Sequence, residues 1–376
     1  MSKSITERSE DMKEIAIIGG GIIGMTLANY IDPKKYHVTL FDEPTGQATS
    51  ASAGIISPWL SKRRNKQWYR LAKDGAAFFP KLVQDFHLDH TIYQRSGTLL
   101  LRPEKQLDTL FTLAEERKKD APEIGTIERL SREQTHDALP LLKPAPALKI
   151  SGGGRLDGKA YLIHMRKKAE HSGVAFVSQR VKLLDEKTIT YAEKKDTFDQ
   201  IILTVGPHLK ELLAPLGYQA DLRPQKGQLL VFQTTLKNSG DFPVAMLDGE
   251  ADLIPFLDGK ILLGATHEND AGWDLKATDQ AFKQLTEGAM PFLAEPEKIL
   301  AAPAHFRVGT RAYTSDFAPF FGSLTDGLLV ASGLGSSGLT TGPYIGYLLA
   351  QYMNTGEANW DDYQKTITNY IHTEKR

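Results

Sequence analysis

The feature that most constrains the fold of this chain is a glycine-rich turn between a short apolar strand and a helix near the N-terminus. Residues 15–18 read Ile-Ala-Ile-Ile, an apolar run typical of a buried parallel strand. Gly19, Gly21 and Gly24 follow at once in the spacing G-x-G-x-x-G. The first glycine permits the tight turn, the second lets a pyrophosphate approach the backbone, and the third lets the helix pack closely on the strand. This arrangement predicts a dinucleotide-binding βαβ unit.

An acidic residue at the end of the next strand supports this prediction. Residues 38–42 read Val-Thr-Leu-Phe-Asp, and Asp42 lies 18 residues after Gly24. An acid there accepts hydrogen bonds from a ribose 2′-hydroxyl and disfavours a 2′-phosphate, so NADP is not expected. Glu43 is the alternative acid. The helix expected over residues 22–31 directs its first N–H groups, at Ile22 and Ile23, and its positive dipole end toward the phosphates.

The loop that follows favours FAD over NAD. A nicotinamide enzyme usually continues from its second strand into another βα unit, whereas residues 45–57 are rich in Thr, Ser, Ala and Gly. Small side chains with hydroxyls suit a backbone that lies along a flavin ribityl chain and ring. On composition alone, a flexible loop is the alternative. The residues expected to contact the cofactor here are Thr49, Ser50, Gly54, Ile55 and Ile56.

With these motifs the chain resembles the D-amino-acid oxidase superfamily of FAD-dependent oxidoreductases, most closely the glycine oxidases and D-amino-acid dehydrogenase-like proteins. The resemblance spans residues 14 to about 350 and implies an α/β fold (α+β overall), with a Rossmann-like FAD-binding domain containing a parallel sheet and a second, mostly antiparallel-sheet substrate domain. Its motifs lie at residues 18–24, 48–54, 223–228, 254–255, 259–266, 309–311 and 333–339.

The order of the predicted elements divides both domains into segments. The FAD-binding domain comprises residues 14–89, 150–222 and 305–376, and the substrate domain comprises residues 90–149 and 223–304. Residues 223–304 alternate apolar and polar, which predicts an antiparallel sheet with one wet face. A last helix is expected around residues 361–371.

Composition excludes several other classes of protein. The net charge of −1 over 376 residues gives no electrostatic case for binding nucleic acid. The absence of cysteine excludes disulfides, thiolate metal sites and flavin attached through sulfur, and the ten histidines lack ligand spacing, so no metal is expected. Some relatives attach flavin covalently through a histidine in the loop at residues 48–54. This loop contains no histidine, so FAD is expected to be non-covalent.

The ends of the chain and one uncharged stretch bear on location. Residues 1–13 do not read as a signal peptide, and residues 1–11 are expected to form a disordered extension. Residues 327–356 carry no charge, but their many glycines favour a buried strand, a cofactor-facing loop and a helix over a membrane span. A cytoplasmic protein without an integral membrane segment is expected, and a homo-oligomer is left open.

Arg311 is the expected catalytic and substrate-binding residue. It lies on an alternating strand, with Gly309 leaving space beside it, and a guanidinium presents a planar fork that suits a carboxylate. In the family that this chain resembles, the arginine of Gly-x-Arg binds the substrate carboxylate. Arg307, in the same register, is the rival.

A second glycine-rich loop precedes a second helix. Near a flavin, the dipole of this helix stabilises the negative charge that gathers on reduction. The resemblance adds Val181, whose backbone meets the adenine, and Gly206 follows another expected strand. The remaining residues expected to contact the cofactor are Gly333, Gly335, Ser336, Ser337, Gly338, Leu339 and Thr340.

Departures from the glycine oxidases concern the substrate. Ser336 replaces an arginine, so it is a candidate substrate contact, and Leu334 stands where relatives often carry histidine. Asp252 replaces an aromatic residue. If it faces the pocket, it favours a cationic side chain or amine, and if it faces solvent, it belongs to an ordinary charged hairpin. Leu262 stands where sarcosine oxidases place a lysine that activates oxygen, which leaves oxidase and dehydrogenase both open.

The predicted function is FAD-dependent oxidation of a D-amino acid, glycine or an N-alkyl glycine at the Cα–N bond. Hydride transfer to the flavin gives an imino acid that hydrolyses to a 2-oxo acid, and O2 or another acceptor takes the electrons. The alternatives are FAD-dependent oxidation of a 2-hydroxy acid and a non-catalytic flavin-binding subunit.

Overall fold

The computed structural model describes residues 12–61, 65–249 and 251–373. In this structure, strand β1 is an inner strand of a six-stranded sheet. Five of its strands are parallel to one another, and β20 runs antiparallel to them at one edge. The expected extension at residues 1–11 lies outside the described residues. In spatial order the strands are β20 (Phe320–Thr325), β21 (Leu328–Ser332), β13 (Gln200–Leu203), β1 (Lys13–Ile18), β2 (Tyr36–Phe41) and β9 (Ala175–Val177).

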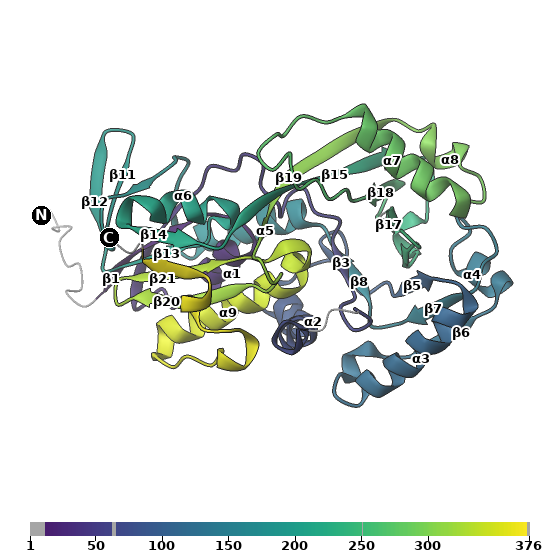
Figure 1. The fold of residues 1–376 in the computed structure, drawn as a ribbon, viewed down its shortest axis with the longest axis horizontal. Coiled ribbons are helices and arrows are strands. Elements are labelled where there is room, and N and C mark those ends of the chain that lie inside the picture. Colours follow the sequence, from purple (N-terminus) through teal and green to yellow (C-terminus); the bar gives the residue numbers. More distant parts are fainter. Residues whose placement is uncertain (1–11, 62–64, 250, 374–376) are drawn as a thin grey trace, which may run out of the picture.

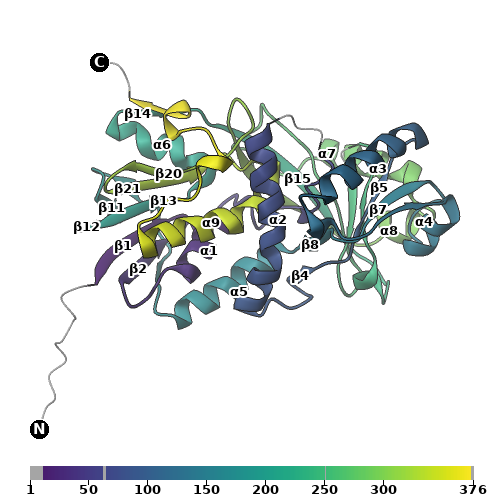
Figure 2. The same ribbon diagram turned by 90° about the horizontal axis from the view of Figure 1, so that it is seen from below.

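Both faces of this sheet are buried, which explains the continuous apolar run of β1. Ile15 and Ile17 pack into a core that includes residues of α1, α2, α5 and α9, whereas Ala16 and Ile18 pack on the opposite face with residues of α6. Figure 2 shows α1, α5 and α9 along one side of the sheet, with α2 crossing them. These helices are α1 (Ile22–Tyr30), α2 (Lys66–Phe86), α5 (Gly158–His171), α6 (Leu209–Leu213) and α9 (Gly338–Thr355).

A second sheet of eight strands forms the other half of the molecule (Figure 1). Its neighbouring strands are antiparallel except β16 and β5, so the predicted fold class is confirmed. The strands, in spatial order, are β19 (Ala304–Tyr313), β15 (Arg223–Gln233), β18 (Lys260–Gly264), β17 (Asp252–Pro255), β16 (Val244–Met246), β5 (Thr98–Leu101), β7 (Ala147–Ile150) and β6 (Ile127–Leu130). The helices of this half are α3 (Glu104–Lys118), α4 (Arg132–Ala138), α7 (Asp279–Ala289) and α8 (Glu297–Leu300).

The prediction that one face of this sheet is exposed to solvent is wrong, because other parts of the protein pack on both faces of its central strands. Leu230 and Phe232 of β15 pack with Leu285 of α7 on the outer face. Leu229 and Val231 lie on the inner face, in a core against which residues of the loop after β2 pack. The alternating pattern of the strands does not reveal that α7 and this loop pack on the two faces of the sheet, because both come from other parts of the chain.

Two chain segments also differ from expectation. Strand β19 pairs with β15 over ten residues, so the boundary placed at residue 305 falls within a strand of the eight-stranded sheet. The helix expected at residues 361–371 is wrong: the chain there forms two short 3-10 turns (Asp361–Tyr363 and Ile367–Asn369) and enters β22 (Ile371–Thr373), which pairs with β14 (Tyr218–Ala220).

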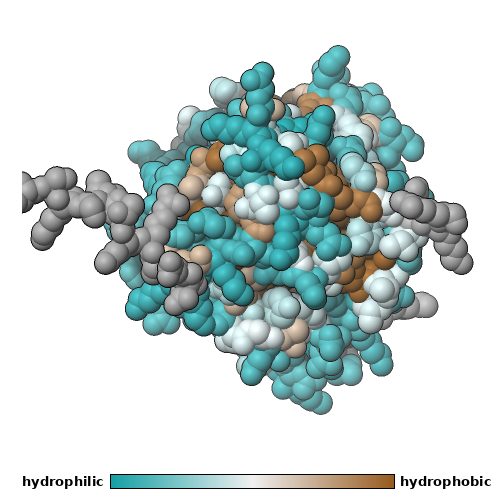
Figure 3. All heavy atoms as spheres, turned by 90° about the vertical axis from the view of Figure 1, so that its left-hand side faces the viewer, coloured by the Kyte–Doolittle hydropathy of each residue, from teal (hydrophilic) through white to brown (hydrophobic). Residues whose placement is uncertain are grey.

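Two further sheets have three strands each. One consists of β3 (Ile55–Ile56), β8 (Gly154–Leu156) and β4 (Tyr93–Gln94). The other consists of β10 (Lys182–Leu183), β11 (Thr188–Tyr191) and β12 (Lys194–Thr197). Among the described residues, no helix is both long and apolar enough to cross a bilayer. On the face drawn in Figure 3, hydrophobic residues lie in groups separated by hydrophilic ones.

Candidate cofactor and substrate site

A cavity of about 1110 Å³ lies between the two sheets. One wall is formed where strands of the parallel sheet end, at Ile18, Asp42, Thr204 and Ser332. Open α/β sheets bind their ligands at this carboxyl edge. The volume exceeds the range of about 300–1,000 Å³ that is typical of pockets for small ligands, so there is room for a large cofactor.

Each glycine of the first motif meets a separate geometric requirement. Gly19 has a φ of +106°, and a Cβ there would lie 2.5 Å from the carbonyl oxygen of Thr204. At Gly24 a Cβ would lie 2.0 Å from the carbonyl oxygen of Gly19, so this glycine lets α1 pack on the turn. Gly21 lines the cavity, and the nearest atom to a Cβ there is Thr49 Oγ1 at 3.6 Å. A side chain at residue 21 would therefore project into space that the ligand needs.

Two helices present their N-termini to this one cavity. The N-cap residues, Gly21 of α1 and Ser337 of α9, make no side-chain capping hydrogen bond, and neither helix has an acid in its first turn. Both ends line the cavity. Because N-terminal N–H groups and the positive dipole end attract negative charge, the cavity is built to receive anionic groups at two places.

Asp42 and Thr49 connect the motif to the loop after β2. Asp42 Oδ1 accepts a hydrogen bond from the N–H of Gly20 at 2.9 Å, and burial raises the pKa of the Asp42 carboxyl. Thr49 Oγ1 accepts from the N–H of Ile22 at 3.0 Å. The loop is thereby held against the start of α1, where both side chains line the cavity.

Arg311 lies at the other wall, on β19. Its Nη1 donates to the carbonyl oxygen of Thr266 at 2.8 Å and to Oε1 of Gln225 at 3.2 Å. The guanidinium lies over Gly227 of β15, where a Cβ would be 2.6 Å from Nη1. The rival Arg307 is not among the residues that line the cavity, because its guanidinium contacts the buried Asp157 at 3.4 Å. The structure therefore separates two arginines that the sequence alone does not.

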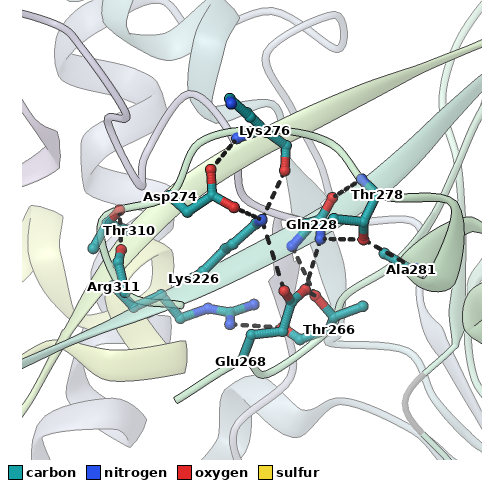
Figure 4. A network of polar contacts seen from close by, with 11 residues as sticks. Lys226, Gln228, Thr266, Glu268, Asp274, Lys276, Thr278, Ala281, Thr310 and Arg311 are labelled. Carbon is teal, nitrogen blue, oxygen red and sulfur yellow. Dashed lines mark hydrogen bonds and ion pairs between the residues drawn. The ribbon is translucent and has the colours of Figure 1, made fainter. Parts of the chain in front are cut away.

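A polar network surrounds Thr266, whose carbonyl oxygen accepts a hydrogen bond from Arg311 (Figure 4). Thr266 Oγ1 donates to Oε1 of Glu268 at 2.6 Å, and Gln228 Nε2 donates to the same oxygen at 2.8 Å. Lys226, which is 1% exposed, lies 3.8 Å from Glu268 and 3.1 Å from Asp274. Sequence reasoning assigned these residues no role, because their side chains meet only when β15 and the segment after β18 pair.

Asp252 lines the same cavity. Its Oδ1 accepts a hydrogen bond from the N–H of Leu247 at 3.1 Å. Burial raises the pKa of Asp252 to about 7, against a smaller lowering by Arg102. Of the two orientations open from the sequence, the structure shows the one that faces the pocket. Met246 and His267 also line the cavity, and no sequence motif pointed to either.

Comparison with known proteins identifies the family. The family model described as FAD dependent oxidoreductase matches residues 14–352. The chain belongs to this family of FAD-dependent oxidoreductases. It is 38% identical over 357 residues to the uncharacterized oxidoreductase YurR of Bacillus subtilis (strain 168), covering 90% of this chain and 94% of that protein. It is 27% identical to a glycine oxidase of Pseudomonas putida, covering 88% of this chain and 92% of the relative.

Solved structures agree with this assignment. Iminodiacetate oxidase (IdaA) from Chelativorans sp. BNC1 superposes with a TM-score of 0.87 at 30% identity, covering 95% of this chain and 98% of that one. Glycine oxidase from Geobacillus kaustophilus has the same fold, with a TM-score of 0.81 at 19% identity and coverage of 94% and 99%.

The cavity fits the FAD of this family, because it combines the open approach at Gly21, the acid at Asp42 and the N-termini of two helices whose N-cap side chains make no capping hydrogen bond. Most residues predicted to bind the cofactor line it, although their contacts with FAD stay predictions. These residues are Gly19, Gly21, Ile22, Ile23, Asp42, Glu43, Thr49, Gly54, Ile55, Val181, Gly206, Gly333, Gly335, Ser336, Ser337, Gly338, Leu339 and Thr340.

Three predicted cofactor residues do not line the cavity. Gly24 is a packing position, Ser50 Oγ donates to Oε1 of Gln47, and Ile56 is buried in the core. Leu262 is also absent from the lining, because its side chain packs into the apolar core on the inner face of the eight-stranded sheet. Among the described residues, no three acidic or histidine side chains are grouped so that they could hold a metal ion.

Proposed function

We propose that this flavoenzyme oxidises an amino acid or an N-substituted glycine at the Cα–N bond. The observation that carries the proposal is the placement of Arg311, whose guanidinium lies on the same cavity as the dinucleotide motif and is held by Thr266 and Gln225. A guanidinium held in one orientation binds a planar carboxylate through two parallel hydrogen bonds. The names of two relatives, glycine oxidase and iminodiacetate oxidase, support an amine substrate that bears a carboxylate.

The protein's part in this reaction is binding and orientation. Arg311 fixes the carboxylate, which leaves the neighbouring Cα and amine as the groups that are directed at the cofactor. Bound FAD supplies the redox chemistry, acceptance of a hydride equivalent from Cα. The imino acid that results takes up water and releases ammonia or an amine, giving a 2-oxo acid. The electrons leave to O2 or to another acceptor.

An anaerobic substrate panel tests this function without assuming an electron acceptor. The purified holoenzyme is mixed with glycine, N-alkyl glycines, both enantiomers of small amino acids and matched 2-hydroxy acids, while the loss of flavin absorbance is followed. Amino acids are expected to bleach the flavin. Bleaching by hydroxy acids alone would replace the proposal with alcohol oxidation, and bleaching by no member of the panel would favour a non-catalytic subunit.

We also infer that FAD is held without a covalent bond, with Asp42 binding the ribose. Acid precipitation is expected to release FAD into the supernatant, because the chain has no cysteine and the loop at residues 45–57 has no histidine. A yellow pellet with a colourless supernatant would contradict this inference.

Asp42→Ala is expected to weaken FAD binding about tenfold to hundredfold, since a hydrogen bond to a charged group contributes about 1.5–3 kcal/mol. The measurement is titration of the apoprotein with FAD. Asp199→Ala is the matched control, because Asp199 also accepts a backbone N–H, that of Glu14, at the far end of β1. Unchanged affinity in Asp42→Ala would move the role to Glu43.

A further inference from the structure

Asp252 and Arg311 lie on the same face of the eight-stranded sheet. In the registers of the sheet, Asp252 is opposite Gly264, Gly264 is opposite Leu229, and Arg311 is opposite Gln225. Residues opposite one another share a face, and so do alternate residues along a strand. The aspartate on β17 and the arginine on β19 therefore both face the nucleotide-binding half.

Two glycines form the floor between them. Gly227 of β15 and Gly264 at the end of β18 both line the cavity. A Cβ at Gly227 would lie 2.6 Å from the Arg311 guanidinium, and one at Gly264 would lie 2.5 Å from Cβ of Leu229. The two glycines, Arg311 and Asp252 all border the same cavity, so one ligand can contact both charged side chains.

The separation of the two charged groups suits a single extended ligand. Neighbouring strands are about 4.8 Å apart, and the Arg311 side chain reaches the carbonyl group of Thr266, just beyond β18 and one strand from β17. The guanidinium and the Asp252 carboxyl are thus on the order of 10 Å apart. An extended diamino acid covers a distance of this order once a hydrogen bond at each end is included.

We propose that Asp252 determines specificity by receiving a positively charged group of the substrate, so that preferred substrates are amino acids with a second cationic group in the side chain or N-substituent. The proposal rests on the proposed function, because it takes Arg311 as the site of the substrate carboxylate. Asp252 then selects the distal part of the molecule.

The surroundings of Asp252 support this role. The guanidinium of Arg102 donates to the carbonyl groups of Leu101, Met246 and Leu247 and contacts Asp248 at 3.5 Å. Burial raises the pKa of Asp252 to about 7, because burial disfavours the charged carboxylate more than Arg102 and the N–H of Leu247 favour it. An arriving cation would favour that charged form. A second substrate carboxylate, as in iminodiacetate, would instead meet a like charge at this wall.

The test compares substrates that differ in one charged group. Ornithine and norvaline share a carbon skeleton and differ by the terminal ammonium, and aspartate adds a second carboxylate. kcat/KM for each is measured, in the configuration that reduces the flavin, for wild type, Asp252→Asn and Asp248→Asn. Asp248→Asn is the matched control, because it removes the same charge from the neighbouring turn and does not line the cavity.

Wild type is expected to prefer ornithine to norvaline by about tenfold to hundredfold. Asp252→Asn is expected to remove most of that preference and to raise the aspartate/norvaline ratio, whereas Asp248→Asn leaves both ratios unchanged. Asparagine retains the oxygen that accepts from Leu247, and ratios within one preparation do not depend on the fraction of active protein. Opposite movement of the two ratios is the result that a purely structural role would not produce.

Three outcomes would overturn the inference: a wild-type preference for norvaline, ratios that do not move in Asp252→Asn, or ratios that move in the same direction. If Asp252→Asn fails to fold, the wild-type preference and Asp252→Ser decide the question. Norvaline reports on the proposed function separately. If it reduces the flavin while the ratios stay fixed, only the role of Asp252 fails, and if no amino acid reduces the flavin, the proposed function fails.

Discussion

Arg311→Ala is expected to lower kcat/KM for amino-acid oxidation by about a hundredfold to ten-thousandfold while FAD stays bound. Two charge-assisted hydrogen bonds to a carboxylate are lost, each worth about 1.5–3 kcal/mol, and they are not fully additive. Arg311→Lys is expected to be intermediate, because lysine keeps the charge but loses the planar fork. Most of the loss should appear in substrate binding, since the arginine holds a group that does not itself react.

Anaerobic stopped-flow reduction of the flavin at varied substrate concentration separates binding from the reduction rate. In wild type, the rate should rise with pH through the titration of the substrate amine, because only the neutral amine has the lone pair that assists departure of the hydride. Arg307→Lys is the matched control on the same strand and face, since Arg307 contacts Asp157 and not the cavity. Wild-type kinetics in Arg311→Ala, or equal turnover of an amine without a carboxylate, would contradict the assignment.

Gly24→Ala is expected to destabilise the fold by about 1–3 kcal/mol or more and to abolish FAD retention. The new Cβ would lie 2.0 Å from the carbonyl oxygen of Gly19 and 2.6 Å from Thr204 Oγ1. Neither atom is free to move, because Thr204 Oγ1 donates to that same carbonyl at 2.7 Å between β1 and β13. Helix α1 would have to move away from the sheet, which displaces its N-terminus from the cavity.

The check is denaturant unfolding of the apoprotein together with FAD content after purification. Gly288→Ala in α7 is the control for the same substitution within a helix, because its Cβ would meet only Cβ of Ala251, at 3.2 Å. A variant that unfolds at the wild-type denaturant concentration and retains FAD would show that the turn relaxes without loss of the helix position.

The nucleotide-binding half was predictable because its signals are local in the sequence. The strand at residues 15–18, the glycine spacing and Asp42 lie within 28 residues, and each has a requirement that only its immediate neighbours impose. The structure places Ile18, Gly19, Gly21 and Asp42 on one cavity, and Gly24 packs α1 against the turn.

The substrate side was less predictable because its features depend on contacts across the chain. Lys226 and Gln228 belong to a motif that resembles the family, but the sequence does not indicate what they do. The structure shows that Lys226 donates to Asp274 and that Gln228 donates to Glu268. The end of the chain was predicted as a helix, yet β22 forms there because it finds an edge to pair with in β14. Pairing of this kind joins residues that no local pattern connects.

By itself, then, the sequence determined a dinucleotide fold of the FAD type and the alternation that places Arg307 and Arg311 on one face of a strand. It did not determine which arginine meets the substrate, because residues four apart on a strand share a face. The tertiary structure distinguishes the two arginines. Arg307 forms an ion pair with Asp157 at the start of α5, whereas the absence of a side chain at Gly227 leaves room for the Arg311 guanidinium at the cavity. The tertiary structure also turned Asp252 inward, because strand parity defines two faces but only the packing of the two halves decides which one encloses the ligand.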